Sequence, residues 1–253
     1  MPDTAAFAQY LPNFLFIMLR AGIFLSMIPF FSSKNLPAQF KIGFLIALAL
    51  ILAPVVEFKI GEASLPLLVM REVVFSMVLG LSVRFVFMAF EMAGQIMSNA
   101  MGLSIATVFN PEMGQSTEIS RLQGIIAMLL FLAMDAHHDL IYIFVKSYEL
   151  VPAGQINLQA LMPEGIALIG KVFVIAIKLA APVTVGMVIV NFLLGFLYKA
   201  APQMNIFFVS FPIYLVLGFL IMLLSIPIFI HVLGGFFGDI QYEMTRIISI
   251  AKG

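Results

Sequence analysis

The sequence predicts an all-α integral membrane protein, built as a helical stack of kinked helical hairpins, and three observations carry this prediction. Hydrophobic residues make up 62% of the 253 residues and charged residues only 10%, whereas soluble domains carry about 25% charged residues. Apolar surface must therefore face lipid or other subunits. Several apolar segments reach the roughly 20 residues that cross a bilayer core. Prolines fall inside these segments, where they bend helices.

Seven apolar segments follow one another along the chain, and helix is the expected state of each. Backbone groups in lipid must be satisfied within their own segment, and the alternation of barrel strands is missing. The segments cover about 12–31, 40–56, 65–90, 92–108, 122–150, 166–199 and 204–237. The prolines that we expect to bend them are Pro29, Pro54, Pro182, Pro212 and Pro227.

Charged residues within these apolar segments need a separate explanation. Charges at bilayer depth are costly and rarely face lipid. These residues therefore either pair inside an assembly or belong to helices that do not lie at bilayer depth. They are Arg20, Arg71, Glu72, Arg84, Lys171 and Lys178.

Composition and motifs exclude several classes of function. Thirteen acids balance thirteen bases, so nothing indicates a nucleic-acid partner. Cysteine is absent, which excludes disulfides and thiolate chemistry. No Walker A loop, H-E-x-x-H motif or dinucleotide fingerprint occurs, and we expect no catalysis and no cofactor. No basic residue precedes Arg20, so we expect no cleavable signal peptide.

A polar cluster at residues 135–139 has two interpretations. Asp135, Asp139 and His138 could share one helix face, and these residue types bind metals. The adjacent His137 and His138, however, would point about 100° apart on a helix. We therefore expect a polar turn between two short apolar helices, 124–134 and 140–146, and no metal site.

Small residues recur every four positions in the fourth apolar segment, at Gly94, Ser98, Gly102 and Ala106. Such a row lets helices approach closely, so we predict close helix packing there. The row leads into residues 109–121, the most polar internal loop, in which Pro111 and Gly114 disfavour helix. A polar loop in so apolar a chain indicates a functional segment, and an ordinary exposed turn is the alternative.

Four stretches of the sequence resemble the FliR family of flagellar proteins, whose counterpart in virulence secretion systems is SctT. Arg20, Pro29 and Pro37 extend the resemblance to nearly the whole chain. The one departure concerns a basic residue before the fourth stretch. The family commonly has it two places before the two alanines of that stretch, whereas here Lys199 lies immediately before them. The stretches are residues 93–114 with Phe-Asn-Pro-Glu-Met-Gly at 109–114, 137–152 with His-His-Asp-Leu-Ile, 178–182, and 200–207 with Ala-Ala-Pro-Gln-Met-Asn-Ile-Phe.

The resemblance implies a non-enzymatic subunit of the flagellar type III protein export gate, a channel for unfolded flagellar proteins. It implies FliP-like and FliQ-like subunits and an FlhB-like protein as partners, contact with membrane lipid, and a place in the bacterial inner membrane and flagellar basal body, with part of the stack on the periplasmic side. It also implies that the single export-gate domain, 1–253, combines a FliP-like part, about 1–150, with a FliQ-like part, about 151–253.

Two sets of site residues follow, the first from the resemblance and the second from the residues themselves. The loop that plugs the channel is matched by Phe109, Asn110, Pro111, Glu112, Met113, Gly114 and Gln115. Amide groups in an apolar setting need partners, which suggests a subunit interface at Pro202, Gln203, Asn205 and Phe207.

Three alternatives to a flagellar gate subunit stay open. A secondary transporter would fit broken apolar helices with buried charges, although no internal symmetry is visible in the sequence. An intramembrane hydrolase would use His137 and His138. A gate subunit of a virulence system would share every feature except the flagellar partners.

Overall fold

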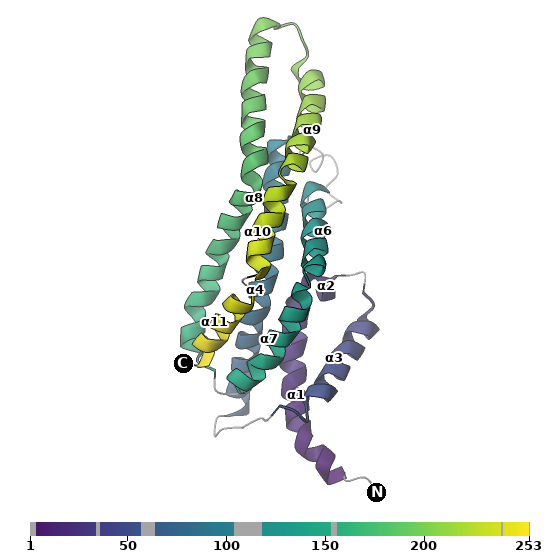
Figure 1. The fold of residues 1–253 in the computed structure, drawn as a ribbon, viewed down its shortest axis with the longest axis vertical. Helices are drawn as coiled ribbons and strands as arrows, with labels where there is room; N and C mark the ends of the chain where they lie inside the picture. The colour runs from purple at the N-terminus through teal and green to yellow at the C-terminus, as the bar shows by residue number, and fades with distance from the viewer. Residues whose placement is uncertain are drawn as a thin grey trace. The chain divides into compact units, whose positions relative to one another are not determined.

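The computed structural model describes residues 4–33, 36–56, 64–103, 118–152, 156–238 and 240–252, and within these ranges the regular structure is entirely helical. The prediction of an all-α fold is confirmed (Figure 1). The helices are α1 (Thr4–Met27), α2 (Pro29–Ser32), α3 (Ala38–Leu52), α4 (Leu65–Ala100), α6 (Glu118–Ala133), α7 (Ala136–Leu150), α8 (Leu158–Ala200), α9 (Ile206–Leu224), α10 (Ile226–Gly238) and α11 (Ile240–Lys252).

Three of the described helices are long and apolar enough to cross a membrane: α4, α8 and the Tyr10–Met27 part of α1. The number rises to five if α6 with α7, and residues 208–252 with their short break, each count as one broken span. Helix α3 is a shorter apolar helix. This composition agrees with the predicted class of integral membrane protein.

The five prolines expected to bend helices fall into two groups. Pro29 begins α2, Pro54 follows the end of α3, and Pro227 is the second residue of α10. A proline in the first turn of a helix, such as Pro29 or Pro227, costs little, because the N–H that it lacks would have no partner within the helix. Pro54 lies beyond the end of α3 and breaks none of its hydrogen bonds. Only Pro182 and Pro212 lie inside helices, in α8 and α9. Most of the expected kinks are therefore breaks between helices.

Helix α4 corrects the division of the sequence at residue 91. The segments 65–90 and 92–108 were expected to be separate, but one helix of 36 residues runs from Leu65 to Ala100. Glu91 is polar yet forms helix readily, as do the methionine and alanine that follow it. The expectation of a polar loop over 109–121 is also wrong at its end, because α6 begins at Glu118 and residues 118–121 are helical.

The chain divides into two compact units that are each discontinuous in sequence. Unit 1 comprises residues 1–85, 135–169 and 237–253, and unit 2 comprises residues 86–134 and 170–236. Both units draw on residues before and after position 150. The division into a FliP-like and a FliQ-like part concerns resemblance to separate proteins, and it stays a prediction.

In unit 1, helical periodicity determines which faces are buried. Helix α11 buries Met244, Ile247, Ile248 and Ala251, the spacing of one apolar helix face. Helix α7 buries a stripe of the same kind, and these two helices pack on each other. Helix α1 packs on α3.

In unit 2, the second half of α4 packs against α6 through a glycine. A Cβ atom placed on Gly94 would lie only 2.6 Å from the Ser120 Cα and 2.9 Å from the Ile119 carbonyl oxygen. The Ser120 hydroxyl donates a hydrogen bond of 2.9 Å to the Glu91 carbonyl oxygen. The two backbones therefore approach as closely as only a glycine allows.

Replacing Gly94 by alanine is expected to destabilise the protein by about 1–3 kcal/mol, because the methyl group must push the α6 backbone away. Gly170 in α8 is the matched control, since nothing lies within 4 Å of its added Cβ. There, alanine should gain about 0.5–1 kcal/mol of helix propensity. The measurement is the midpoint of thermal unfolding of each purified variant. Equal shifts for the two variants would contradict the close contact at Gly94.

Candidate functional site: a buried charge network and the base of a loop

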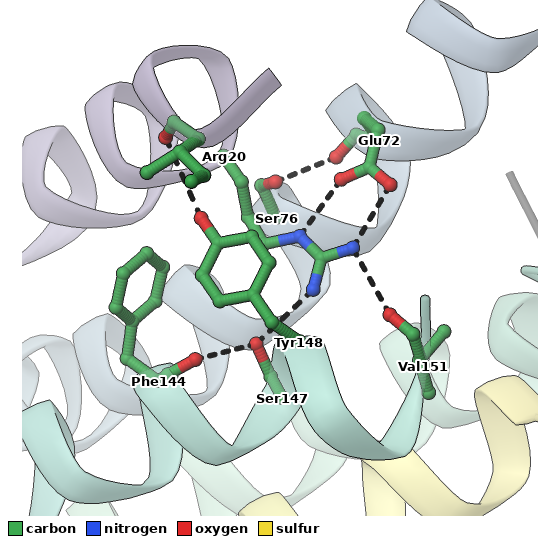
Figure 2. A network of polar contacts seen from close by, with 8 residues as sticks. Arg20, Glu72, Ser76, Phe144, Ser147, Tyr148 and Val151 are labelled. Carbon is green, nitrogen blue, oxygen red and sulfur yellow. Dashed lines mark hydrogen bonds and ion pairs between the residues drawn. The ribbon is translucent and has the colours of Figure 1, made fainter. Parts of the chain in front are cut away.

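A fully buried ion pair joins α1 to α4 inside unit 1 (Figure 2). Arg20 Nε donates to Glu72 Oε2 at 2.8 Å, and Arg20 Nη2 donates to Glu72 Oε1 at 2.9 Å. Both side chains are 0% exposed. This parallel two-bond geometry is the strong form of an arginine–carboxylate contact.

Helix α7 and the residue that follows its last turn supply the remaining hydrogen-bond partners of the guanidinium. Arg20 Nη1 donates to the Ser147 hydroxyl at 3.2 Å, and Nη2 donates to the Val151 carbonyl oxygen at 3.3 Å. The Ser147 hydroxyl in turn donates to the Phe144 carbonyl oxygen at 2.6 Å. Four hydrogen bonds thus use the five N–H donors of the arginine almost completely.

The guanidinium also lies over the faces of two aromatic rings. The Arg20 Cζ atom lies 4.2 Å from the centre of the Tyr148 ring and 4.8 Å from the centre of the Phe75 ring. The Tyr148 hydroxyl donates to the Ile17 carbonyl oxygen at 3.4 Å. Water is excluded, and attraction between the cation and the two rings adds to the ion pair.

This network fixes the relative positions of three helices, α1, α4 and α7, that are not neighbours in the sequence. It satisfies both charges, so the desolvation cost of each is offset only while α1, α4 and α7 keep this arrangement. Its chemistry is therefore that of a structural lock.

Sequence reasoning identified Arg20 and Glu72 as charges needing an explanation but did not pair them. The signal was present: Arg20 is the only charged residue of segment 12–31, and Glu72 is the only acid of segment 65–90. A buried charge is tolerated when an opposite charge pairs with it. This rule would have favoured the pairing of Arg20 with Glu72 over pairing with partners in other subunits.

In unit 2, the C-terminal end of α4 is closed by a Schellman motif. Gly102 has a φ of +71°. The Leu103 N–H donates to the Ser98 carbonyl oxygen at 3.0 Å, and the Gly102 N–H donates to the Asn99 carbonyl oxygen at 3.1 Å. A glycine after the helix end adopts this left-handed conformation without strain. Helix α4 therefore stops at a defined point.

The four residues of the predicted packing row thus have different surroundings. Gly94 contacts the α6 backbone, Ser98 is 0% exposed, and Gly102 ends the helix. Ala106 lies outside the described residues, as does the predicted plug loop with Phe109, Asn110, Pro111, Glu112, Met113, Gly114 and Gln115. The described helices α4 and α6 flank that loop in sequence, and the contact at Gly94 joins them.

Three of the four predicted interface residues lie in the turn between α8 and α9 of unit 2, and Phe207 is the second residue of α9. Pro202, Gln203 and Asn205 follow the end of α8 and are exposed on this chain. The Met204 N–H donates to the Ala201 carbonyl oxygen at 3.1 Å and closes the turn. The side chain of Phe207 lies outside the described part of the structure.

The polar cluster forms the start of α7 in unit 1. Asp135 precedes the helix with a φ of +55°, and His137 and His138 lie in its first turn. The possible ligand atoms of these three residues lie within 4.8 Å of one another. Asp135 and His138 are 74% and 71% exposed, an arrangement that is common in proteins without an ion. The expectation that no metal binds there stays a prediction.

The hairpin of α8 and α9 in unit 2 exposes much apolar surface. Soluble monomers rarely expose large contiguous apolar patches, and such patches mark contact with membrane or protein. Residues that are more than half exposed on this hairpin are Phe173, Val174, Ile177, Val185, Val188, Ile189, Phe192, Leu193, Phe196, Phe208, Val216, Leu220, Leu223 and Leu224.

Comparison with known proteins gives concordant matches over the chain. Residues 11–240 match the model of a family described as bacterial export proteins, family 1. The flagellar biosynthetic protein FliR of Bacillus subtilis (strain 168) is 29% identical over 248 residues, covering 94% of this chain and 95% of that protein. The protein of that name from Caulobacter vibrioides is 30% identical, covering 87% and 90%. That from Escherichia coli (strain K12) is 26% identical, covering 95% and 94%.

Replacing Arg20 by leucine should reduce the stability of the protein by about 3–5 kcal/mol, because Glu72 is left as an unpaired buried charge. The double replacement of Arg20 by methionine and Glu72 by leucine removes both charges and should recover most of that loss. The measurement is the thermal unfolding midpoint, together with the amount of full-length chain in membranes.

The matched control for this prediction is the ion pair of Arg246 and Glu164, whose side chains are 43% and 16% exposed. Replacing Arg246 by leucine should cost no more than about 1 kcal/mol. If the variant of Arg20 alone is as stable as this control, or if the double variant is the less stable, the buried pair is not the lock described here.

Proposed function

This chain belongs to the bacterial export proteins of family 1, and on that premise we propose that it is a subunit of the flagellar type III protein export gate. In that role it forms, with FliP-like and FliQ-like subunits and an FlhB-like protein, a channel in the bacterial inner membrane at the flagellar basal body. Unfolded flagellar proteins pass through the channel, and the loop around residues 109–115 closes it at rest.

The observation that carries this proposal is the match to relatives over nearly their full length. The chain covers 95% of the Bacillus subtilis FliR protein and 94% of the Escherichia coli one. A shared domain within an otherwise different protein would not extend so far. The flagellar names of these relatives favour a flagellar system over a virulence system.

The exposed apolar hairpin of α8 and α9 supports the need for partners. Its row of exposed residues includes Phe192 and Phe196, at 69% and 61% exposure. Burying apolar surface contributes about 25 cal/mol per Å², so neighbouring subunits that cover this hairpin would hold the assembly together. The turn with Pro202, Gln203 and Asn205, together with Phe207 at the start of α9, would lie in such an interface, and the turn would supply amide groups to it.

The geometry of α4 and α6 supports the role of the loop as a plug. The contact of Gly94 with Ser120 and the hydrogen bond from Ser120 to Glu91 hold the two helices together. The glycine cap at Gly102 ends α4 sharply. A loop that joins two firmly packed helices returns to one place after it is displaced. Phe109 and Met113 provide the bulk to block a narrow channel, and methionine adapts its shape.

Energy for transport would come from other components of the apparatus. The sequence has no phosphate-binding loop, and its chemistry offers no catalytic constellation. We therefore propose that this subunit acts as a conduit and seal and has no enzymatic role.

Deleting residues 110–115 should leave the complex assembled but make the inner membrane leak ions or small dyes at rest, because the bulk of the plug is gone. The measurement is dye uptake or ion conductance in cells that make the deleted form. Co-purification of the partner subunits with the tagged chain reports assembly separately.

The control for the deletion is Glu112→Gln, which keeps the bulk of the loop and should stay as tight as the unmodified protein. An assembled complex that carries the deletion and does not leak would show that the loop is an ordinary turn. Failure of the unmodified tagged chain to co-purify any FliP-like or FliQ-like protein would contradict the proposed assembly itself.

A further inference from the structure

A pocket of about 410 Å³ lies in unit 1 between the end of α1, α2 and the beginning of α3. Its walls are mostly apolar and include Leu25, Phe31, Ile42 and Leu45. Helices α1 and α3 are in ordinary contact beside it, since a Cβ on Gly22 would lie 3.5 Å from the Leu45 side chain. The volume falls within the range of small-molecule pockets, which is about 300–1,000 Å³.

A lysine at the wall of this pocket carries a charge that the described residues do not neutralise. Lys41 Nζ donates a hydrogen bond of 2.7 Å to the Ser33 carbonyl oxygen and is partly buried. Among the described ranges of the chain it forms no ion pair. A carbonyl oxygen uses one of the three ammonium donors and leaves the charge uncompensated. A partly buried cation of this kind favours an anion beside it.

We propose that this pocket binds a phospholipid with an anionic head group. The phosphate contacts the Lys41 ammonium, and an acyl chain lies along Leu25, Phe31 and Leu45. A phospholipid matches both properties of the site, because it joins a negative group to a long apolar chain. A free phosphate would leave the apolar walls uncovered, and an uncharged lipid would leave the lysine without an anion.

The position of the pocket along the helices favours lipid over a protein segment. The candidate membrane span of α1 ends at Met27, and Ser26 of that last turn lines the pocket. Lys41 lies in the first turn of α3. Lipid head groups lie at the ends of membrane spans, where basic side chains reach them. The lysine is therefore placed at the depth of a phosphate group.

The test uses the full chain, purified together with its partner subunits and placed in lipid nanodiscs. The nanodiscs contain phosphatidylglycerol or phosphatidylcholine that carries a photoreactive group in its acyl chain. Mass spectrometry then measures labelling of peptides that contain Leu25 and Leu45. We expect phosphatidylglycerol to label them about fivefold more than phosphatidylcholine, the factor that one lysine beside an anionic lipid provides.

Variants of single residues separate the contribution of the Lys41 charge from that of the pocket volume. Lys41→Gln should reduce labelling by phosphatidylglycerol to the level of phosphatidylcholine, and Lys41→Arg should keep it. Lys252→Gln removes an exposed charge from the end of α11 and should change nothing. Ser26→Phe fills the pocket with Lys41 in place and should reduce labelling by both lipids. If Lys41→Gln does not assemble, the lipid comparison on the unmodified complex and Ser26→Phe still decide.

Equal labelling by the two lipids, or full labelling of an assembled Lys41→Gln complex, would overturn the proposal. Absence of label from these peptides while α8 peptides of the same sample are labelled would overturn it too, because a partner subunit would then cover the pocket. Co-purification of the partners is read independently, so a failed lipid site and a failed gate assignment give different results.

Discussion

The constraint on which the account of this protein depends is the length of its apolar helices compared with the thickness of a bilayer. Helix α8 has 43 residues and is therefore about 65 Å long, whereas the hydrocarbon core is about 30 Å thick. Exposed apolar residues occur from Met162 to Leu197, a rise of about 52 Å. Even a tilt of about 40° would reduce this span to only about 40 Å. Lipid alone cannot cover it, so protein partners must cover the rest.

The buried ion pair of Arg20 and Glu72 meets a related constraint within the chain. An apolar subunit that must fit several neighbours needs one arrangement of its own helices, and apolar side chains alone are tolerant of sliding. The pair is satisfied only when α1, α4 and α7 adopt the arrangement in Figure 2. Its contribution is specificity of packing more than net stability. The apolar exterior can then be devoted to lipid and partners.

Much of this architecture could be predicted from the sequence, and the differences have physical causes. The helical class follows from composition. The break expected in α4 near Glu91 was wrong. A polar residue ends a run of apolar residues, but it does not end a helix. The pairing of Arg20 with Glu72 joins residues 52 positions apart, and no local pattern encodes such a contact. The glycine contact at Gly94 was foreseeable as a type of packing, but its partner, Ser120, depends on how the chain turns back.

The most direct test of this account measures at which position along α8 contact with lipid ends and contact with partner subunits begins. The chain has no cysteine, so single cysteines can be placed along the exposed row of α8 and spin-labelled in the assembled complex. The positions are Met162, Ile166, Phe173, Ile177, Val188, Phe192 and Phe196. The account predicts one lipid-exposed band of at most about 20 residues, detected by oxygen accessibility, with the other labels immobile and protected by partners. Lipid contact along the whole row, or free water access beyond the band, would contradict it.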